Sequence, residues 1–165
     1  MNLFLLRHAH SESGGDDAVR PLSAKGEKTV AKLGEFLRKQ KIPLPEAFDH
    51  SPLLRARQTA EILAETIGGE HRVREIEGMA PMDDVAEIAR ELYTEKHDRL
   101  LVGHEPHLGR LASLLICDDE NADAFDFKKG GILRLEHRII VNPADGQFSR
   151  WIANWMLTPQ LYSGR

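Results

Sequence analysis

An apolar run that ends abruptly in two basic residues sets the strongest constraint on the fold of this 165-residue chain. Residues 3–6 are all large and apolar, and Arg7 and His8 follow them directly. A parallel strand that is covered on both faces needs apolar residues throughout. In open α/β sheets, ligands bind just beyond the carboxyl ends of such strands. The run therefore predicts a buried strand whose end carries a binding site with two basic side chains.

Strand-like and helix-like segments alternate along most of the chain, which is typical of an α/β fold. Further strands are expected at residues 47–50, 73–76 and 99–103. Amphipathic helices are expected at about 23–40, from about 54 to Gly68, from 83 or 84 to about 92, and over 108–115. Ser23 is the expected N-cap of the first helix, and Asp83 or Asp84 that of the third.

The last third of the sequence has a different pattern. Residues 131–137 and 148–156 read as two strands around a turn at 142–146. They are expected to form an antiparallel edge on a mainly parallel sheet. The sequence thus predicts one α/β domain over residues 1–165, with three layers: a mostly parallel central sheet, helices on both of its faces, and an antiparallel C-terminal edge.

Composition narrows the classes of partner. Lysine and arginine number 22 against 26 acidic residues, so the net charge of −4 argues against a nucleic-acid partner. A locally basic pocket in an acidic protein would favour a small anionic ligand. No apolar run approaches the roughly 20 residues of a membrane span. With a single cysteine, Cys117, expected to be buried, and no signal-peptide pattern, a cytoplasmic location is expected.

Basic residues lie at three of the predicted junctions between a strand and the next helix. Besides Arg7 and His8, Arg55 follows the second strand and His104 follows the strand at 99–103. Junctions at the carboxyl edge of such a sheet can converge on one pocket. Arginine binds phosphate oxygens bidentately and stays charged at any working pH, so two arginines with two histidines would suit a phosphoryl group.

Four ordered motifs give the chain a resemblance to a known family. They are Arg7-His8-Ala9, the stretch from Arg20-Pro21-Leu22 to Gly26, the stretch from Ser51-Pro52 through Arg55 to Ala60, and Val102-Gly103-His104-Glu105-Pro106. In this order they resemble the histidine phosphatase superfamily, and with the short length most of all its SixA-type phosphohistidine phosphatases. The resemblance runs from Met1 to about Gly109.

The resemblance implies a role for each matching residue. His8 would be the nucleophile that becomes phosphorylated, while Arg7, Arg55 and His104 would hold the phosphate and stabilise the transition state. Arg20 would lie at the edge of the pocket. No cofactor or metal is implied, because the arginines supply the positive charge. The implied partner is a protein that carries phosphohistidine, such as a phosphotransfer domain, or a small phosphorylated substrate.

Two departures from the family pattern bear on the substrate. Ala9 replaces the signature glycine, which suggests a backbone conformation that tolerates a methyl group. The carboxylate that protonates the leaving oxygen in mutase-like members has no recognisable motif here, and Glu75, Glu77 and Asp83 are the candidates. An alcohol leaving group needs such an acid. Imidazole departs more readily, so the missing motif favours phosphohistidine over sugar phosphates.

Three functions other than a phosphohistidine phosphatase are also compatible with the sequence. The first is a metal-independent phosphatase of small phosphate esters, and another is a phosphate-binding protein without activity. The third is a metal-dependent hydrolase, because His8-x-His10 and His104-x-x-His107 contain potential ligands that His50 and Asp49 could join. The histidines expected to have only structural roles are His10, His50, His71, His97 and His137.

Overall fold

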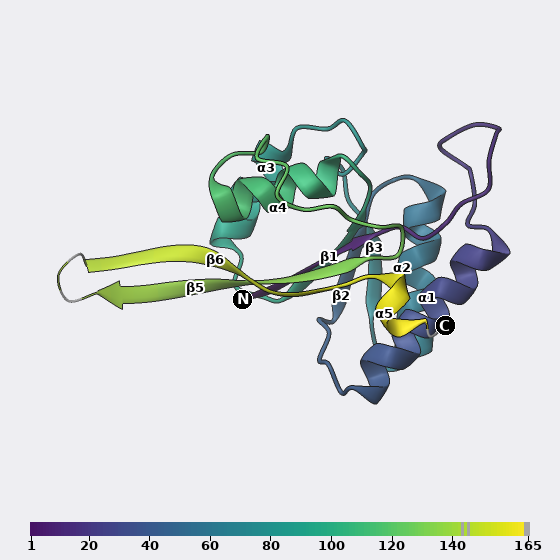
Figure 1. Ribbon diagram of the computed structural model, residues 1–165, viewed down its shortest axis with the longest axis horizontal. Helices are drawn as coiled ribbons and strands as arrows, with labels where there is room; N and C mark the ends of the chain where they lie inside the picture. The colour runs from purple at the N-terminus through teal and green to yellow at the C-terminus, as the bar shows by residue number, and fades with distance from the viewer. Residues whose placement is uncertain (143, 145, 164–165) are drawn as a thin grey trace.

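The structure, a computed structural model, describes residues 1–142, 144 and 146–163 and contains a six-stranded sheet with helices on both faces (Figure 1). The strand order is β3-β2-β4-β1-β5-β6. The parallel part consists of β1 (Asn2–Arg7), β2 (Ala47–His50), β3 (Arg72–Glu75) and β4 (Arg99–Gly103). The antiparallel edge consists of β5 (Ile132–Asn142) and β6 (Gly146–Leu157). The expected mixed α/β sheet is confirmed.

Four of the helices form where the apolar spacing predicts them, namely α1 (Ala24–Lys39), α2 (Leu54–Ile67), α3 (Val85–Thr94) and α4 (His107–Cys117). A fifth, the short α5 (Pro159–Tyr162), was not predicted. Ser23 caps α1, since its hydroxyl accepts a hydrogen bond from the Gly26 N–H. Asp84, not Asp83, caps α3, and the carboxylate of Asp83 instead accepts a hydrogen bond from the Ala80 N–H. Each such cap contributes about 1 kcal/mol.

Two apolar cores lie on opposite faces of the sheet. One contains the buried residues of α3 and α4 together with Leu3, Leu5 and Trp151. The other contains the buried residues of α1 and α2 together with Phe4 and Leu6. The chain therefore leaves β1 toward α1 on one face, and leaves β4 toward α4 on the other. A crevice opens between neighbouring strands whose connections diverge in this way.

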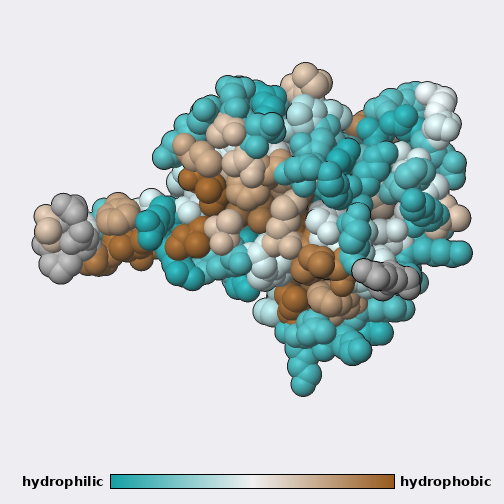
Figure 2. Space-filling view, viewed as in Figure 1, coloured by the Kyte–Doolittle hydropathy of each residue, from teal (hydrophilic) through white to brown (hydrophobic). Residues whose placement is uncertain are grey.

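The last two strands are longer than the sequence pattern predicts. Ile132–Glu136 of β5 pair with β1, and the His137 N–H donates to the Met1 carbonyl at 2.9 Å. Beyond His137, β5 and β6 pair with each other. This outer part projects from the body as a two-stranded arm (Figure 1). Figure 2 shows hydrophobic residues on the arm, where Ile139 and Val141 are 65% and 72% exposed. Of the predicted turn, Pro143 and Asp145 lie outside the described residues.

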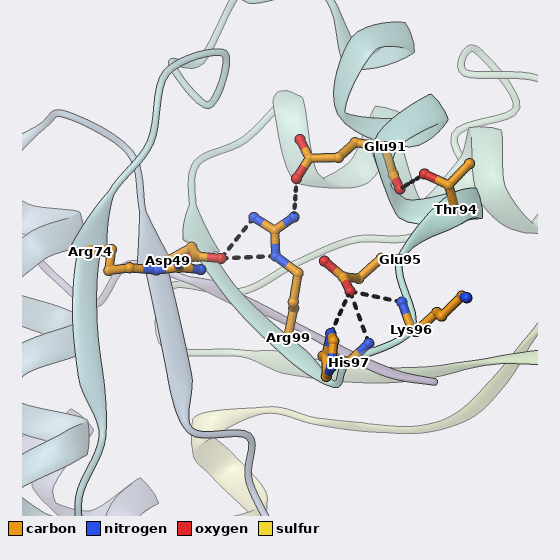
Figure 3. A network of polar contacts seen from close by, with 8 residues as sticks. All are labelled: Asp49, Arg74, Glu91, Thr94, Glu95, Lys96, His97 and Arg99. Carbon is orange, nitrogen blue, oxygen red and sulfur yellow. Dashed lines mark hydrogen bonds and ion pairs between the residues drawn. The ribbon is translucent and has the colours of Figure 1, made fainter.

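A buried ion-pair network ties three parallel strands together (Figure 3). Asp49 of β2 is fully buried, and its two carboxylate oxygens accept hydrogen bonds of 2.8 Å from Arg74 of β3 and Arg99 of β4. Arg99 also pairs with Glu91 of α3. Arg99 is the first residue of β4, so the network lies away from the carboxyl end of that strand. Removing one partner of the buried Asp49–Arg99 pair costs about 3–5 kcal/mol.

The expectation for Cys117 is wrong. This residue ends α4 and its side chain is exposed, because the buried face of the helix is formed by Leu108, Leu111, Ala112 and Leu115. Within the described part of the chain, no helix is long and apolar enough to cross a membrane.

Candidate active site

Two histidines meet at the carboxyl ends of two neighbouring parallel strands. Arg7 of β1 lies in register with Gly103 of β4, and the residues that follow them are His8 and His104. The His8 N–H donates to the Gly103 carbonyl oxygen at 2.9 Å, which fixes one strand end to the other. The two imidazole centroids are 4.9 Å apart. Strand pairing alone therefore places the two rings side by side.

His8 is held as a neutral imidazole with a defined tautomer. Its Nδ1 lies 2.7 Å from the Ala9 carbonyl oxygen. A carbonyl can only accept, so Nδ1 carries the proton and Nε2 keeps its lone pair. Burial, helped by the charges of Arg55, Arg7 and Lys129, lowers the pKa of His8 to about 3, against the opposing effect of the Ala9 carbonyl. An imidazole with a free Nε2 lone pair is a nucleophile at neutral pH.

His104 is almost fully buried beside it. Its Nε2 is hydrogen-bonded to the Ser51 hydroxyl, while its Nδ1 is buried and has no partner among the described residues. Burial and the neighbouring charges of His8 and Arg55 lower its pKa to about 2. Ser51 precedes α2, and its N–H donates to the Val102 carbonyl of β4 at 3.0 Å. The hydroxyl thereby fixes the orientation of the His104 ring.

The charges of Arg7 and Arg55 act on both histidines, and Arg20 is linked to Arg55 through Asp17. All three arginines have an unused donor among the described residues. Arg7 ends β1 and donates to the Phe127 carbonyl, while Arg55 lies in the first turn of α2 and is 4% exposed. Arg20 lies in the loop before α1. In each of the three, Nε is buried without a hydrogen-bond partner among the described residues. Unpaired buried donors are costly, and an oxyanion would satisfy them.

Asp17 connects two of these arginines. Its backbone carbonyl and its carboxylate accept hydrogen bonds from Arg55 at 2.8 and 3.1 Å, and the carboxylate also pairs with Arg20. The two arginines hold the pKa of Asp17 below its usual range. The carboxylate thus binds the donors that a phosphate would need, and the sequence analysis did not identify it.

Lys129 adds a fourth cation that the sequence analysis also missed. Burial and the charges of Arg7, Arg20 and Arg55 lower the pKa of Lys129. The next residue, Gly130, donates its N–H to the carbonyl oxygens of Arg7 and His8 at 3.1 and 3.2 Å. The signal was the pair Lys128-Lys129 just before β5. A strand antiparallel to β1 must begin where β1 ends, so these lysines had to lie near His8.

None of the three candidate acids lies among the charges that act on the two site histidines. Those charges come from arginine, lysine and histidine, and Glu75, Glu77 and Asp83 are not among them. Asp83 acts instead on His107. The carboxyl nearest in sequence to His104 is Glu105, which is partly buried. Burial raises the pKa of Glu105 to about 6 against the opposing charge of Arg7, and its Oε1 has no partner among the described residues.

The alanine that replaces the signature glycine fits without strain. Ala9 is buried in the core beneath α1 and α2, and its backbone lies outside the left-handed region. Its N–H donates to the Thr59 hydroxyl at 3.3 Å, and that hydroxyl donates to the Arg55 carbonyl at 2.7 Å. Ala9 therefore links the end of β1 to the first turn of α2.

Of the potential metal ligands, His8 and His104 lie side by side without a third ligand among the described residues. Within residues 1–142, 144 and 146–163, no group of three or more His, Cys, Asp or Glu side chains is placed to hold an ion. His50 is hydrogen-bonded through Nδ1 to the Ser51 carbonyl, and Asp49 belongs to the network of Figure 3.

Comparison with known proteins agrees with this geometry. The model of the histidine phosphatase superfamily (branch 1) matches residues 3–107. An uncharacterised protein of Picosynechococcus is 34% identical over 142 residues, which cover 82% of this chain and 84% of that protein. The chain belongs to the histidine phosphatase superfamily.

More distant relatives in this superfamily match the chain over nearly its whole length. The phosphohistidine phosphatase SixA of Escherichia coli is 24% identical over 164 residues, which cover 96% of this chain and 94% of SixA. A solved structure of SixA complexed with tungstate superposes with a TM-score of 0.76 at 22% identity, covering 96% of this chain and 97% of that one. The fold is therefore shared from the first strand to the C-terminal hairpin.

Proposed function

We propose that the chain is a metal-independent phosphatase that hydrolyses phosphohistidine in a protein, through a covalent intermediate on His8. One observation carries the proposal. The neutral His8 has its Nδ1 bound to the Ala9 carbonyl, and the charges of Arg7 and Arg55 act on it, two arginines whose Nε donors have no partner among the described residues. A nucleophile surrounded by unsatisfied cationic donors suits an anionic electrophile such as a phosphoryl group. Tungstate, bound in the SixA structure, is an oxyanion of similar shape.

The first step forms the covalent intermediate. Nε2 of His8 attacks phosphorus in line, the bond between phosphorus and the substrate nitrogen breaks, and the leaving imidazole takes up a proton from solvent. Arg7, Arg55 and His104 hold the phosphoryl oxygens, and the two arginines balance their charge. Arg20 and Lys129 add positive charge at the edge of the pocket. Splitting the hydrolysis in this way makes each step easier than direct attack by water.

The second step releases the phosphate. A water molecule attacks phosphorus, the bond to Nε2 of His8 breaks, and inorganic phosphate leaves while His8 returns to its neutral form. The burial that keeps His8 neutral also disfavours a positive charge on the phosphorylated ring, so the Ala9 carbonyl that binds Nδ1–H has to stabilise it. The tautomer is thus fixed by the same contact in both steps.

A phosphatase of small phosphate esters is the second candidate, and Glu105 is the observation that favours it. A carboxyl with a pKa raised to about 6 beside Arg7 has the properties of a general acid for an alcohol leaving group. Glu105→Gln distinguishes the two functions. If esters are the substrate, the variant loses about 100-fold in kcat on an alkyl phosphate. If phosphohistidine is the substrate, its rate on a phosphohistidine peptide stays within about threefold.

The direct test is a substrate panel with a trapped intermediate. Wild-type protein is expected to hydrolyse phosphohistidine peptides faster than sugar or alkyl phosphates, and to keep its activity in EDTA. His8→Ala should abolish turnover and labelling of the protein by radioactive phosphate. His97→Ala is the matched control, because that ring is exposed and lies at the start of β4, away from the site. Activity retained in His8→Ala would refute the proposed nucleophile.

A further inference from the structure

A groove lined by five lysines begins beside the candidate active site. It has a volume of about 700 Å³ and lies between α1, the segment before β5, and α5. Its lysines are Lys25, Lys28 and Lys32 of α1, with Lys128 and Lys129 on the opposite side, and none of the described residues that line it is acidic. In a protein with a net charge of −4, this is a strong local concentration of positive charge. We call it the lysine groove.

Helical spacing aligns the three lysines of α1. They are separated by three and four residues, so their side chains emerge on one face of the helix over about 10 Å. Gly26 allows this helix to begin against the active-site loop, because a Cβ there would lie 2.0 Å from the His10 carbonyl oxygen. The face that carries the lysines is therefore set at a fixed position relative to His8.

Most of these charges are not neutralised within the protein. Lys128 pairs with Asp126, and Lys32 donates to the Ser163 carbonyl at 2.9 Å. For Lys25, Lys28 and Lys129, no acceptor lies within hydrogen-bonding distance of the ammonium group among the described residues. Exposed ammonium groups that lack internal partners are free to bind an external anionic surface.

Lys129 connects the lysine groove to the proposed phosphate site. Lys129 lines the groove, and its charge acts on His8 and on the three site arginines. His10 also lines the groove, two residues beyond His8, and its Nδ1 is hydrogen-bonded to Ser23, the cap of α1, at 2.8 Å. A macromolecule whose phosphoryl group reaches His8 would therefore lie with its adjoining surface over α1.

We infer that the lysine groove docks an acidic helix face of the protein that carries the phosphohistidine, an inference that rests on the proposed function. Carboxylates at helical spacing on the partner would match the spacing of Lys25, Lys28 and Lys32. Complementary charge of this kind raises the association rate and fixes the orientation of the partner. The phosphate site then selects the phosphoryl group, while the groove selects the protein that carries it.

The test reverses two groove charges that take no part in phosphate handling. Lys25→Glu with Lys28→Glu keeps helix propensity, and both side chains are exposed. Against a phosphotransfer domain phosphorylated on histidine and bearing an acidic helix, the double variant should show a KM roughly tenfold higher. Its rate on p-nitrophenyl phosphate should be unchanged. Lys39→Glu with Lys96→Glu, outside the groove, is the matched control and should behave as wild type.

A second arm shows whether the effect comes from protein docking. When the acidic helix of the phosphotransfer domain is neutralised by Asp→Asn and Glu→Gln changes, the lysine reversal should no longer alter KM. An unchanged KM on the acidic domain would overturn the inference. So would an equal loss of rate on a short phosphohistidine peptide without acidic residues, which would place the lysines in phosphate handling. Lys25→Ala with Lys28→Ala repeats the test should the reversal prevent folding.

The same panel separates this inference from the proposed function. If wild-type protein hydrolyses phosphohistidine peptides but the lysine reversal has no effect on the acidic domain, only the docking surface is refuted. If wild-type protein hydrolyses alkyl phosphates and no phosphohistidine substrate, the proposed function fails, and the docking surface fails with it.

Discussion

Acid should destabilise this protein through the two buried histidines of the site, and the size of the effect follows from their burial. His8 and His104 are 6% and 1% exposed, and burial lowers their pKa values to about 3 and about 2. In the unfolded chain each has a pKa of about 6.5. Between pH 6.5 and 3 the unfolded chain therefore binds protons that the native state does not bind. Stability is fully present above pH 6.5 and falls as the pH decreases through this range.

The stability lost at pH 5.0 does not depend on how far below 4 the pKa values of the two histidines lie in the native state. For each histidine it is the cost of protonating the unfolded form alone, about 2 kcal/mol between pH 7.5 and 5.0. Glu105 acts in the opposite sense, because its raised pKa lets the native state take up a proton first. When wild type is compared with a variant at one histidine, the effect of Glu105 and of every other group that titrates equally in both proteins drops out of the difference.

The assay is urea unfolding at pH 7.5 and 5.0 for wild type, His8→Gln and the control His97→Gln. Wild type and His97→Gln should lose the same free energy of unfolding between the two pH values. His8→Gln should lose about 2 kcal/mol less, because it has no buried ring to keep unprotonated. The slope with urea should be equal in all three, so that midpoints can be compared. An equal loss in His8→Gln and wild type would refute the neutral nucleophile.

Three further predictions concern the groups that support the site. Asp17→Asn releases the guanidinium of Arg55, so inorganic phosphate should inhibit about three- to fivefold more strongly; weaker inhibition would show that Asp17 organises the site. Ser51→Ala removes the hydroxyl that orients the ring of His104, so kcat in steady-state kinetics should fall roughly tenfold or more with little change in KM. A change in KM alone would exclude the positioning role of Ser51. Tyr162→Phe leaves the Gly130 carbonyl without its 2.7 Å hydrogen bond, so the free energy of unfolding in denaturant should fall by about 1–3 kcal/mol. An unchanged unfolding midpoint would mean that water replaces the hydroxyl.

Site residues that follow directly from local sequence signals were predictable. His8, Arg55 and His104 each come just after a strand or open the next helix, and such positions are marked by an apolar run followed by a basic residue. The pairing of β1 with β4 then brings the first and last of them together. A site built at strand ends can be read from the sequence, because the strands themselves can be read.

The residues that the sequence did not reveal depend on contacts between distant segments. Lys129 reaches the site only through the antiparallel register of β5 on β1, and Asp17 only through the loop that folds over α2, where the Leu54 N–H donates to the Ala18 carbonyl. Cys117 was misjudged for a related reason. Its apolar neighbours suggested burial, but its place on the helix is fixed by which face of α4 meets the sheet.

The strand order explains why His8, the proposed nucleophile, is buried. His8 follows the central strand β1, so its backbone and most of its ring are enclosed by β4, α2 and the Gly130 segment. The chain leaves β1 and β4 toward opposite faces of the sheet, and a crevice opens between neighbouring strands whose connections diverge in this way. Gly130 has a left-handed φ of 81°, and a Cβ there would meet the Tyr162 hydroxyl at 2.9 Å. The absence of a side chain lets this segment approach His8 closely, and the same approach places Lys129 between the lysine groove and the proposed phosphate site.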